Sequence, residues 1–69
     1  MPIVRVELWS GAPAQVKQGL VRGITDVVVA QVKCAPQAVM VLIDERPKED
    51  WSTAGTLHTE LFKGVEPGK

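Results

Sequence analysis

This chain is poor in the side chains with which small proteins form disulfide bonds and structural metal sites. It has one cysteine, Cys34, and one histidine, His58, so an intrachain disulfide is impossible and no cluster of residues has the spacing of a metal site. A chain of 69 residues hides only about 60% of the surface that its unfolded form exposes. We therefore expect neither metal nor cofactor, and we expect oligomerisation to supply the missing stability.

The sequence also lacks an excess of either charge and any long apolar segment. Eight lysine and arginine residues balance eight aspartate and glutamate residues, unlike the basic surface of a nucleic-acid-binding domain. No apolar run approaches the roughly 20 residues that span a bilayer, and the chain does not begin like a signal peptide. The composition predicts one soluble, cytoplasmic domain over residues 1–69 that binds neither nucleic acid nor membranes, with a loosely ordered tail over residues 63–69.

Changes of periodicity divide most of the chain into a strand, a helix and a second strand. Residues 2–8 alternate between apolar and polar side chains, which predicts a strand with one strongly apolar face. Residues 13–33 have apolar side chains at helical spacing, and Pro36 limits this helix. Residues 39–43 (Val-Met-Val-Leu-Ile) are continuously apolar, which is typical of a strand covered on both faces. A right-handed crossover would make the two strands parallel, so the predicted fold is an α/β (α+β) subunit of β-α-β type.

One helix cannot cover both faces of the predicted sheet. Because residues 39–43 indicate burial on both sides, we expect partner subunits on the face opposite the helix. Arg5 falls on that opposite face, where we expect it to pair with carboxylates between subunits. Beyond the second strand, Pro47 ends strand pairing, and residues 56–62 predict a short strand or hairpin arm.

Two segments of the chain resemble the 4-oxalocrotonate tautomerase family. The first is residues 2–6, Pro-Ile-Val-Arg-Val, and the second is residues 44–55, Asp-Glu-Arg-Pro-Lys-Glu-Asp-Trp-Ser-Thr-Ala-Gly. The resemblance extends over residues 2–62. It implies that the β-α-β subunits pair into dimers with four-stranded sheets, and that the dimers assemble into a hexamer.

The chemistry that the resemblance implies depends on Pro2. If Met1 is removed, the Pro2 nitrogen becomes a secondary amine, and a free α-amino group has a reference pKa of about 7.7–8. Desolvation or a neighbouring cation lowers such a pKa and provides a neutral base near physiological pH. The resemblance implies that Pro2 is the general base that moves a proton on an enol or α-keto compound. The alternative is that Pro2 is only a residue tolerated before a strand.

The resemblance also implies a substrate pocket, and the sequence departs from the family there. Trp51 matches the family's aromatic pocket wall, and Leu8 and Trp9 match an apolar wall contributed by a neighbouring subunit. Family members that act on dicarboxylates have arginines where this chain has Ala12 and Met40. An apolar pocket that includes Met40 favours an aromatic enol over a dicarboxylate.

Several of these side chains have a second interpretation. Trp51 is alternatively a hydrophobic plug at a subunit edge, and Trp9 an interface residue. Arg46 follows the expected second strand and either replaces a missing cation or is a solvated loop charge. Cys34 is expected to be a small hydrophobic residue at a helix end, and His58 a surface or interface residue without a chemical role.

Two functions are compatible with this pattern. The first is a tautomerase or isomerase acting on a small enol or keto acid. The second is a non-catalytic or complementing subunit of a mixed oligomer, in which a paralogous chain supplies the missing arginines. The expected assembly is accordingly a homo-oligomer or a hetero-oligomer with that paralogous chain.

Overall fold

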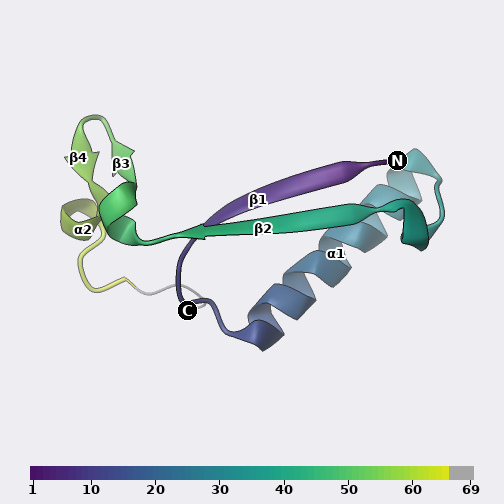
Figure 1. Ribbon diagram of the computed structural model, residues 1–69, viewed down its shortest axis with the longest axis horizontal. Helices are drawn as coiled ribbons and strands as arrows, with labels where there is room; N and C mark the ends of the chain where they lie inside the picture. Colours follow the sequence, from purple (N-terminus) through teal and green to yellow (C-terminus); the bar gives the residue numbers. More distant parts are fainter. Residues whose placement is uncertain (66–69) are drawn as a thin grey trace.

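The computed structural model describes residues 1–65, in which one long helix lies against a pair of long strands (Figure 1). Strands β1 (Ile3–Trp9) and β2 (Met40–Arg46) are parallel, and helix α1 (Ala14–Val32) connects them. The register pairs Ile3 with Met40 at one end and Trp9 with Arg46 at the other. The predicted β-α-β subunit is confirmed. The smaller elements are the 3₁₀-helices η1 (Pro36–Ala38) and η2 (Lys48–Asp50), strands β3 (Ser52–Thr53) and β4 (Thr56–Leu57), and helix α2 (His58–Leu61).

Helix α1 has nearly the predicted length, and its ends explain why it begins and stops there. Pro13 is the N-cap in an extended conformation, one position before the helix. Lys33 is the C-cap in the left-handed region, with φ of 61°, and its N–H donates to the carbonyl of Val29 at 2.9 Å. The chain then enters η1 through Pro36, which cannot continue an α-helix.

The strands continue beyond the predicted segments at their C-terminal ends. Trp9, one position beyond the strand predicted over residues 2–8, is the last residue of β1. Strand β2 continues through polar residues to Arg46 and stops directly before Pro47, which has no N–H for the ladder. The segment predicted as a strand or hairpin arm is divided between β4 and α2. Of the predicted tail, residues 66–69 lie outside the described part of the chain.

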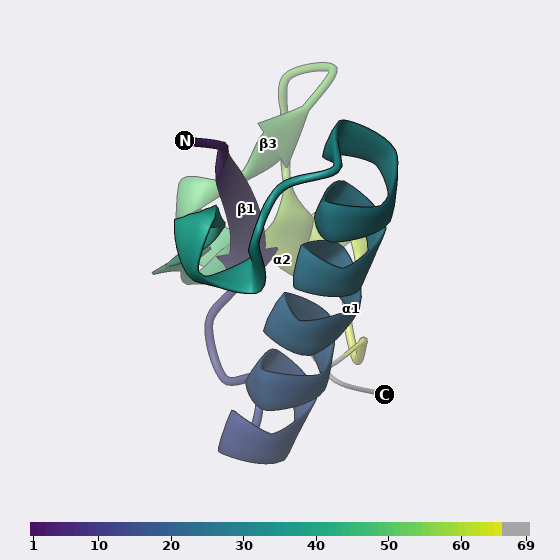
Figure 2. The ribbon, with the colours of Figure 1, turned by 90° about the vertical axis from the view of Figure 1, so that its right-hand side faces the viewer.

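A single chain leaves most of its apolar side chains partly exposed to solvent. Helix α1 covers one face of the strands (Figure 2), and the side chains of β1 that face it are half-buried. The opposite face exposes Ile3 by 61%, Met40 by 48% and Leu42 by 38%. Among residues 1–65, no apolar side chain is fully buried. The part of the chain that the structure describes therefore has no hydrophobic core of its own, as expected of a subunit that is covered by partners.

The uncovered face becomes charged toward the C-terminal ends of the strands. Arg5 pairs with Asp44 at 3.5 Å and Arg46 pairs with Glu7 at 3.4 Å, each across a diagonal between the two strands. The register of β2 thus gives Arg5 a carboxylate partner within its own chain, and its pairing between subunits stays a prediction. All four side chains are about half exposed or more, so each pair contributes at most about 1 kcal/mol.

Candidate functional site

Pro2 and Trp51 lie at opposite ends of the strand pair. Pro2 precedes β1, and its carbonyl accepts a hydrogen bond from the N–H of Met40 at 3.0 Å. Trp51 follows β2, beyond η2, next to the hairpin of β3 and β4 (Figure 1). Seven strand residues at about 3.3 Å each separate the two ends by roughly 20 Å. A single chain therefore cannot bring Pro2 and Trp51 together in one pocket.

Four aromatic rings form a cluster at the end opposite Pro2. Trp9 comes from the end of β1, whereas Trp51, His58 and Phe62 come from the hairpin region and α2. The Trp51 and His58 rings stack with centroids 5.6 Å apart. The Trp9 ring contacts His58 at 5.7 Å and Phe62 at 5.3 Å. We call these four residues the aromatic cluster.

A cavity of about 430 Å³ lies beside the aromatic cluster, between the end of β1 and the beginning of α1. It brings together Leu8, Trp9 and Trp51, the residues for which a pocket wall is predicted. Met40 and Pro2 lie at the other end of the strands and do not line it. Its walls are almost entirely apolar, a surface suited to a flat hydrophobic ligand. The lining residues are Glu7, Leu8, Trp9, Ala12, Val16, Leu20, Trp51, His58 and Phe62.

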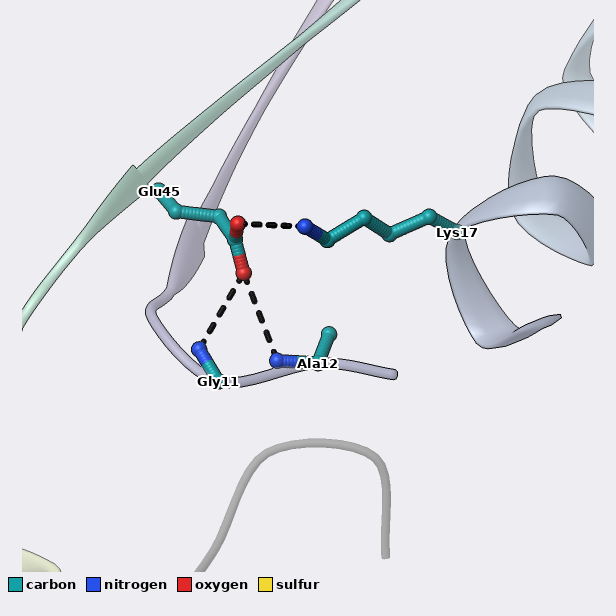
Figure 3. Close-up of polar contacts among 4 residues, drawn as sticks. All are labelled: Gly11, Ala12, Lys17 and Glu45. Atoms are coloured by element: carbon teal, nitrogen blue, oxygen red, sulfur yellow. Dashed lines mark hydrogen bonds and ion pairs between the residues drawn. The ribbon is translucent and has the colours of Figure 1, made fainter. Parts of the chain in front are cut away.

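The loop that carries Ala12 into this cavity is held by Glu45 (Figure 3). Glu45 Oε1 accepts hydrogen bonds from the backbone N–H groups of Gly11 at 3.2 Å and Ala12 at 3.3 Å. Its Oε2 lies 2.6 Å from Lys17 Nζ on α1. Gly11 has φ of 107°, a conformation that residues with a Cβ rarely adopt.

These contacts lower the pKa of Glu45. The hydrogen bond from Lys17 is the largest cause, and the two backbone N–H groups act in the same direction against the opposing effect of burial. Glu45 is therefore ionised at neutral pH, and its negative charge ties the β1–α1 loop to both β2 and α1.

Ala12 and Met40, the two positions at which the family resemblance implies arginines, are far apart in one chain. Ala12 lies at the aromatic cavity. Met40 is the first residue of β2, hydrogen-bonded to Pro2 through its backbone and exposed on the uncovered face. Cations introduced at these two positions could meet in one site only if different subunits supplied them.

Arg46 is the last residue of β2, so the expectation that it follows the strand is wrong. Its guanidinium pairs with Glu7 at 3.4 Å. Its carbonyl accepts hydrogen bonds from Trp51 Nε1 at 3.0 Å and from the N–H of Ser10 at 2.9 Å. Arg46 does not line the aromatic cavity, and its backbone helps to position Trp51.

Two side chains of this region were not predicted to contribute to it. His58, expected at the surface or an interface, is the most enclosed side chain among residues 1–65, with 8% of its surface exposed. Lys48 places its ammonium 4.8 Å from the centroid of the Trp9 ring and donates to the carbonyls of Phe62 and Val65. No sequence pattern indicates either arrangement, because both depend on the path of the chain after Pro47.

Residues 1–65 contain no group of three histidine, cysteine or acidic side chains that could hold a metal ion. Over the same range, no helix has both the length and the apolar character needed to cross a bilayer.

Comparison with known proteins identifies the family. Residues 2–60 match the family model described as tautomerase enzyme. This chain belongs to the tautomerase family. A protein of Ralstonia nicotianae named as a probable tautomerase is 34% identical to this chain over 68 residues, covering 99% of this chain and 97% of the relative. The resemblance stated for residues 2–6 and 44–55 is confirmed.

Solved structures of 4-oxalocrotonate tautomerases share the fold of this chain. A 4-oxalocrotonate tautomerase isozyme from Methylibium petroleiphilum superposes with a TM-score of 0.85 at 30% identity, covering 93% of this chain and 100% of the other. A chain of a heterohexameric 4-oxalocrotonate tautomerase from Chloroflexus aurantiacus superposes with a TM-score of 0.84 at 24% identity, covering 88% and 98%.

Proposed function

We propose that this protein isomerises a small enol or α-keto compound with the Pro2 nitrogen as general base, in a site shared between subunits. The observation that carries the proposal is the placement of Pro2 and the aromatic cavity at opposite ends of β1. A catalytic base and a binding wall that lie roughly 20 Å apart in one chain must come from different chains if they serve one reaction.

The exposed surfaces support such an assembly. Within residues 1–65, β1 is hydrogen-bonded to β2 along one edge only. If two chains pair antiparallel along their free β1 edges, a four-stranded sheet forms. In that sheet the Pro2 end of one chain lies beside the aromatic end of the other. The apolar side chains Ile3, Met40 and Leu42 remain exposed on the open face, which favours association of such dimers into a hexamer.

In the proposed reaction, Pro2 lacks Met1 and its ring nitrogen is uncharged. This nitrogen removes a proton from the carbon next to a carbonyl, and the electron pair moves into the conjugated system as an enolate. Pro2 then returns the proton elsewhere on the conjugated system, at the enolate oxygen in the case of phenylpyruvate, so the base is regenerated and no second substrate is consumed. Trp9 and Trp51 would hold the substrate's flat apolar part. Because Ala12 and Met40 supply no cation, an aromatic enol such as that of phenylpyruvate is the favoured substrate class.

The test is a matched pair of samples that differ only in Met1. One batch is prepared with Met1 retained, and half of it is treated with methionine aminopeptidase; intact mass confirms both states. With Met1 attached, the Pro2 nitrogen is an amide and cannot accept a proton. We expect tautomerisation of phenylpyruvate only in the treated half, with a rate that rises with pH as the amine loses its proton. Equal rates in the two halves would show that Pro2 is not the base.

A second candidate function rests on Ala12 and Met40. A solved neighbour of the same fold is a heterohexamer, and in a mixed assembly another chain would supply arginines at the equivalent positions. This candidate predicts that the purified chain, with Pro2 free, has little activity until the partner chain is added. Substantial activity of the chain alone would exclude it.

A further inference from the structure

His58 is a polar side chain surrounded by aromatic rings. It begins the short helix α2, and its backbone N–H donates to the carbonyl of Trp51 at 3.0 Å. Its ring stacks on Trp51 with an interplanar angle of 20°, and it meets Trp9 and Phe62 edge to face, at 83° and 75°. At 8% exposure it has little contact with solvent. A polar side chain so enclosed is stable only if both of its ring nitrogens have hydrogen-bond partners.

Both ring nitrogens do have partners, and the partners determine the tautomer. Trp9 Nε1 lies 3.0 Å from His58 Nδ1. An indole N–H can only donate, so Nδ1 must accept and carries no proton. Nε2 therefore carries the proton of the neutral ring and donates to Thr53 Oγ1, at 2.8 Å. This arrangement holds the neutral imidazole in one tautomer and one orientation.

The same tautomer excludes a nucleophilic role for Thr53. A threonine hydroxyl beside a histidine resembles a nucleophile with its general base. Here, however, Nε2 already carries the proton and cannot accept another from the Thr53 hydroxyl. The hydrogen bond to Thr53 instead connects the histidine to strand β3.

His58 also connects the two tryptophans of the cavity wall. The Trp9 ring has Lys48 near one face at 4.8 Å, and its N–H is bound by His58. Trp51 stacks on His58, while its own N–H donates to the carbonyl of Arg46 at 3.0 Å. Each indole is thus held by its N–H and by its ring, and the imidazole of His58 contacts both indoles.

We propose that His58 is the positioning residue of the substrate pocket, acting through its neutral Nε2–H tautomer to fix Trp9 and Trp51 as a preformed aromatic wall. The proposal rests on the proposed function, since it assigns this wall to substrate binding. A preformed wall lowers the ordering cost of binding a flat ligand. His58 itself exchanges no proton with the substrate.

The first measurement uses the unmodified protein. In ¹⁵N NMR spectra at neutral pH, we expect the Nδ1 signal of His58 in the unprotonated range and the Nε2 signal in the protonated range. We also expect slow solvent exchange of the Trp9 indole proton. His58 is the only histidine, so the assignment is unambiguous. A protonated Nδ1, or rapid exchange of the Trp9 indole proton, would overturn the proposal without any variant.

The second measurement compares variants that separate the two hydrogen bonds. His58→Phe keeps an aromatic ring and removes both bonds, whereas His58→Asn keeps an acceptor near the position of Nδ1. Thr53→Val removes only the link to β3. We expect rapid exchange of the Trp9 indole proton in His58→Phe, and slow exchange in His58→Asn and Thr53→Val. If Asn fails to restore slow exchange while the protein remains folded and assembled, the Nδ1 contact is not what fixes Trp9.

The kinetic measurement distinguishes positioning from general stability. In His58→Phe we expect KM for phenylpyruvate to rise about three- to tenfold, with a smaller change in kcat and partial recovery in His58→Asn. An unchanged KM with a mobile Trp9 would overturn the positioning role. The NMR result is independent of the Met1 test: a correct tautomer in an inactive protein contradicts the proposed function alone, and a wrong tautomer in an active protein contradicts this inference alone.

Discussion

Glu45 Oε2 and Lys17 Nζ lie 2.6 Å apart, and this ion pair connects the end of β2 to the first turn of α1. The second oxygen of the same carboxylate binds the loop between β1 and α1 through the N–H of Ala12. Because Ala12 lines the aromatic cavity, one carboxylate connects the stability of the fold to the shape of the candidate site.

The first prediction concerns acid stability. The pKa of Glu45 in the folded protein is below its ordinary value of 4.5, chiefly because Lys17 donates to it. The unfolded chain then binds a proton more readily than the folded one, so this stabilisation is present above pH 4.5 and is lost as the pH falls through the folded-state pKa. We expect Glu45→Gln to lower the melting temperature at pH 7 and to reduce its decline below pH 4.5.

Thermal unfolding at a fixed protein concentration over a pH series tests this expectation, because the stability of an oligomer depends on concentration. Glu49→Gln is the matched control, since Glu49 is an exposed glutamate of η2, and it should retain the acid dependence of the unmodified protein. If the melting temperature of Glu45→Gln falls with acid as steeply as that of the unmodified protein, a group other than Glu45 determines the acid stability.

The second prediction concerns assembly. Leu42 is 38% exposed on the face that α1 leaves uncovered, and in an oligomer an aspartate there would bury an unpaired charge. We expect Leu42→Asp to dissociate or unfold the protein, as measured by light scattering coupled to size exclusion. Gln37→Asp, an exposed position in η1, should assemble normally. A mass of 7.5 kDa, that of a single chain, for the unmodified protein at micromolar concentration would contradict both the expected oligomer and the proposed site shared between subunits.

The third prediction concerns substrate charge. Ala12→Arg together with Met40→Arg should increase kcat/KM for a dicarboxylate enol more than either change alone, because each cation stabilises negative charge in the site. Gln31→Arg adds one positive charge, as each single variant does, but at an exposed position of α1, and it should not increase kcat/KM. An assembled double variant without any gain would mean that the two positions do not share a pocket.

The fourth prediction concerns the aromatic wall. Trp51→Leu keeps an apolar side chain but removes the ring stacked on His58 and the hydrogen bond to the Arg46 carbonyl. We expect kcat/KM to fall about three- to tenfold more for phenylpyruvate than for an aliphatic keto acid of similar length. Equal losses on both substrates would indicate that Trp51 supports folding and not recognition. Parallel melting curves separate these two results.

The strands and the long helix were predictable from the sequence because their signals are local. The alternation of residues 2–8 determines which face of β1 meets the helix, and Pro47 ends β2 because it lacks an N–H. The need for partners was also predictable, since residues 39–43 are apolar on both faces of a sheet that has one helix. Family resemblance assigned Trp51 to an aromatic pocket wall, and Leu8 and Trp9 to an apolar wall contributed by a neighbouring subunit. The structure places all three around one cavity of a single chain, and their contact with a substrate stays a prediction.

Tertiary structure alone decided which hydrogen-bond and ion-pair partners the polar groups around the aromatic cavity find. Glu45 binds Lys17 and Ala12, 28 and 33 residues away in sequence, only because β2 returns parallel to β1. His58 meets Trp9 across 49 residues, and its burial depends on the hairpin folding back over the end of β1. Hydrophobic periodicity is set by neighbours along the chain, whereas the partner of a buried donor or acceptor is set by which elements meet in space.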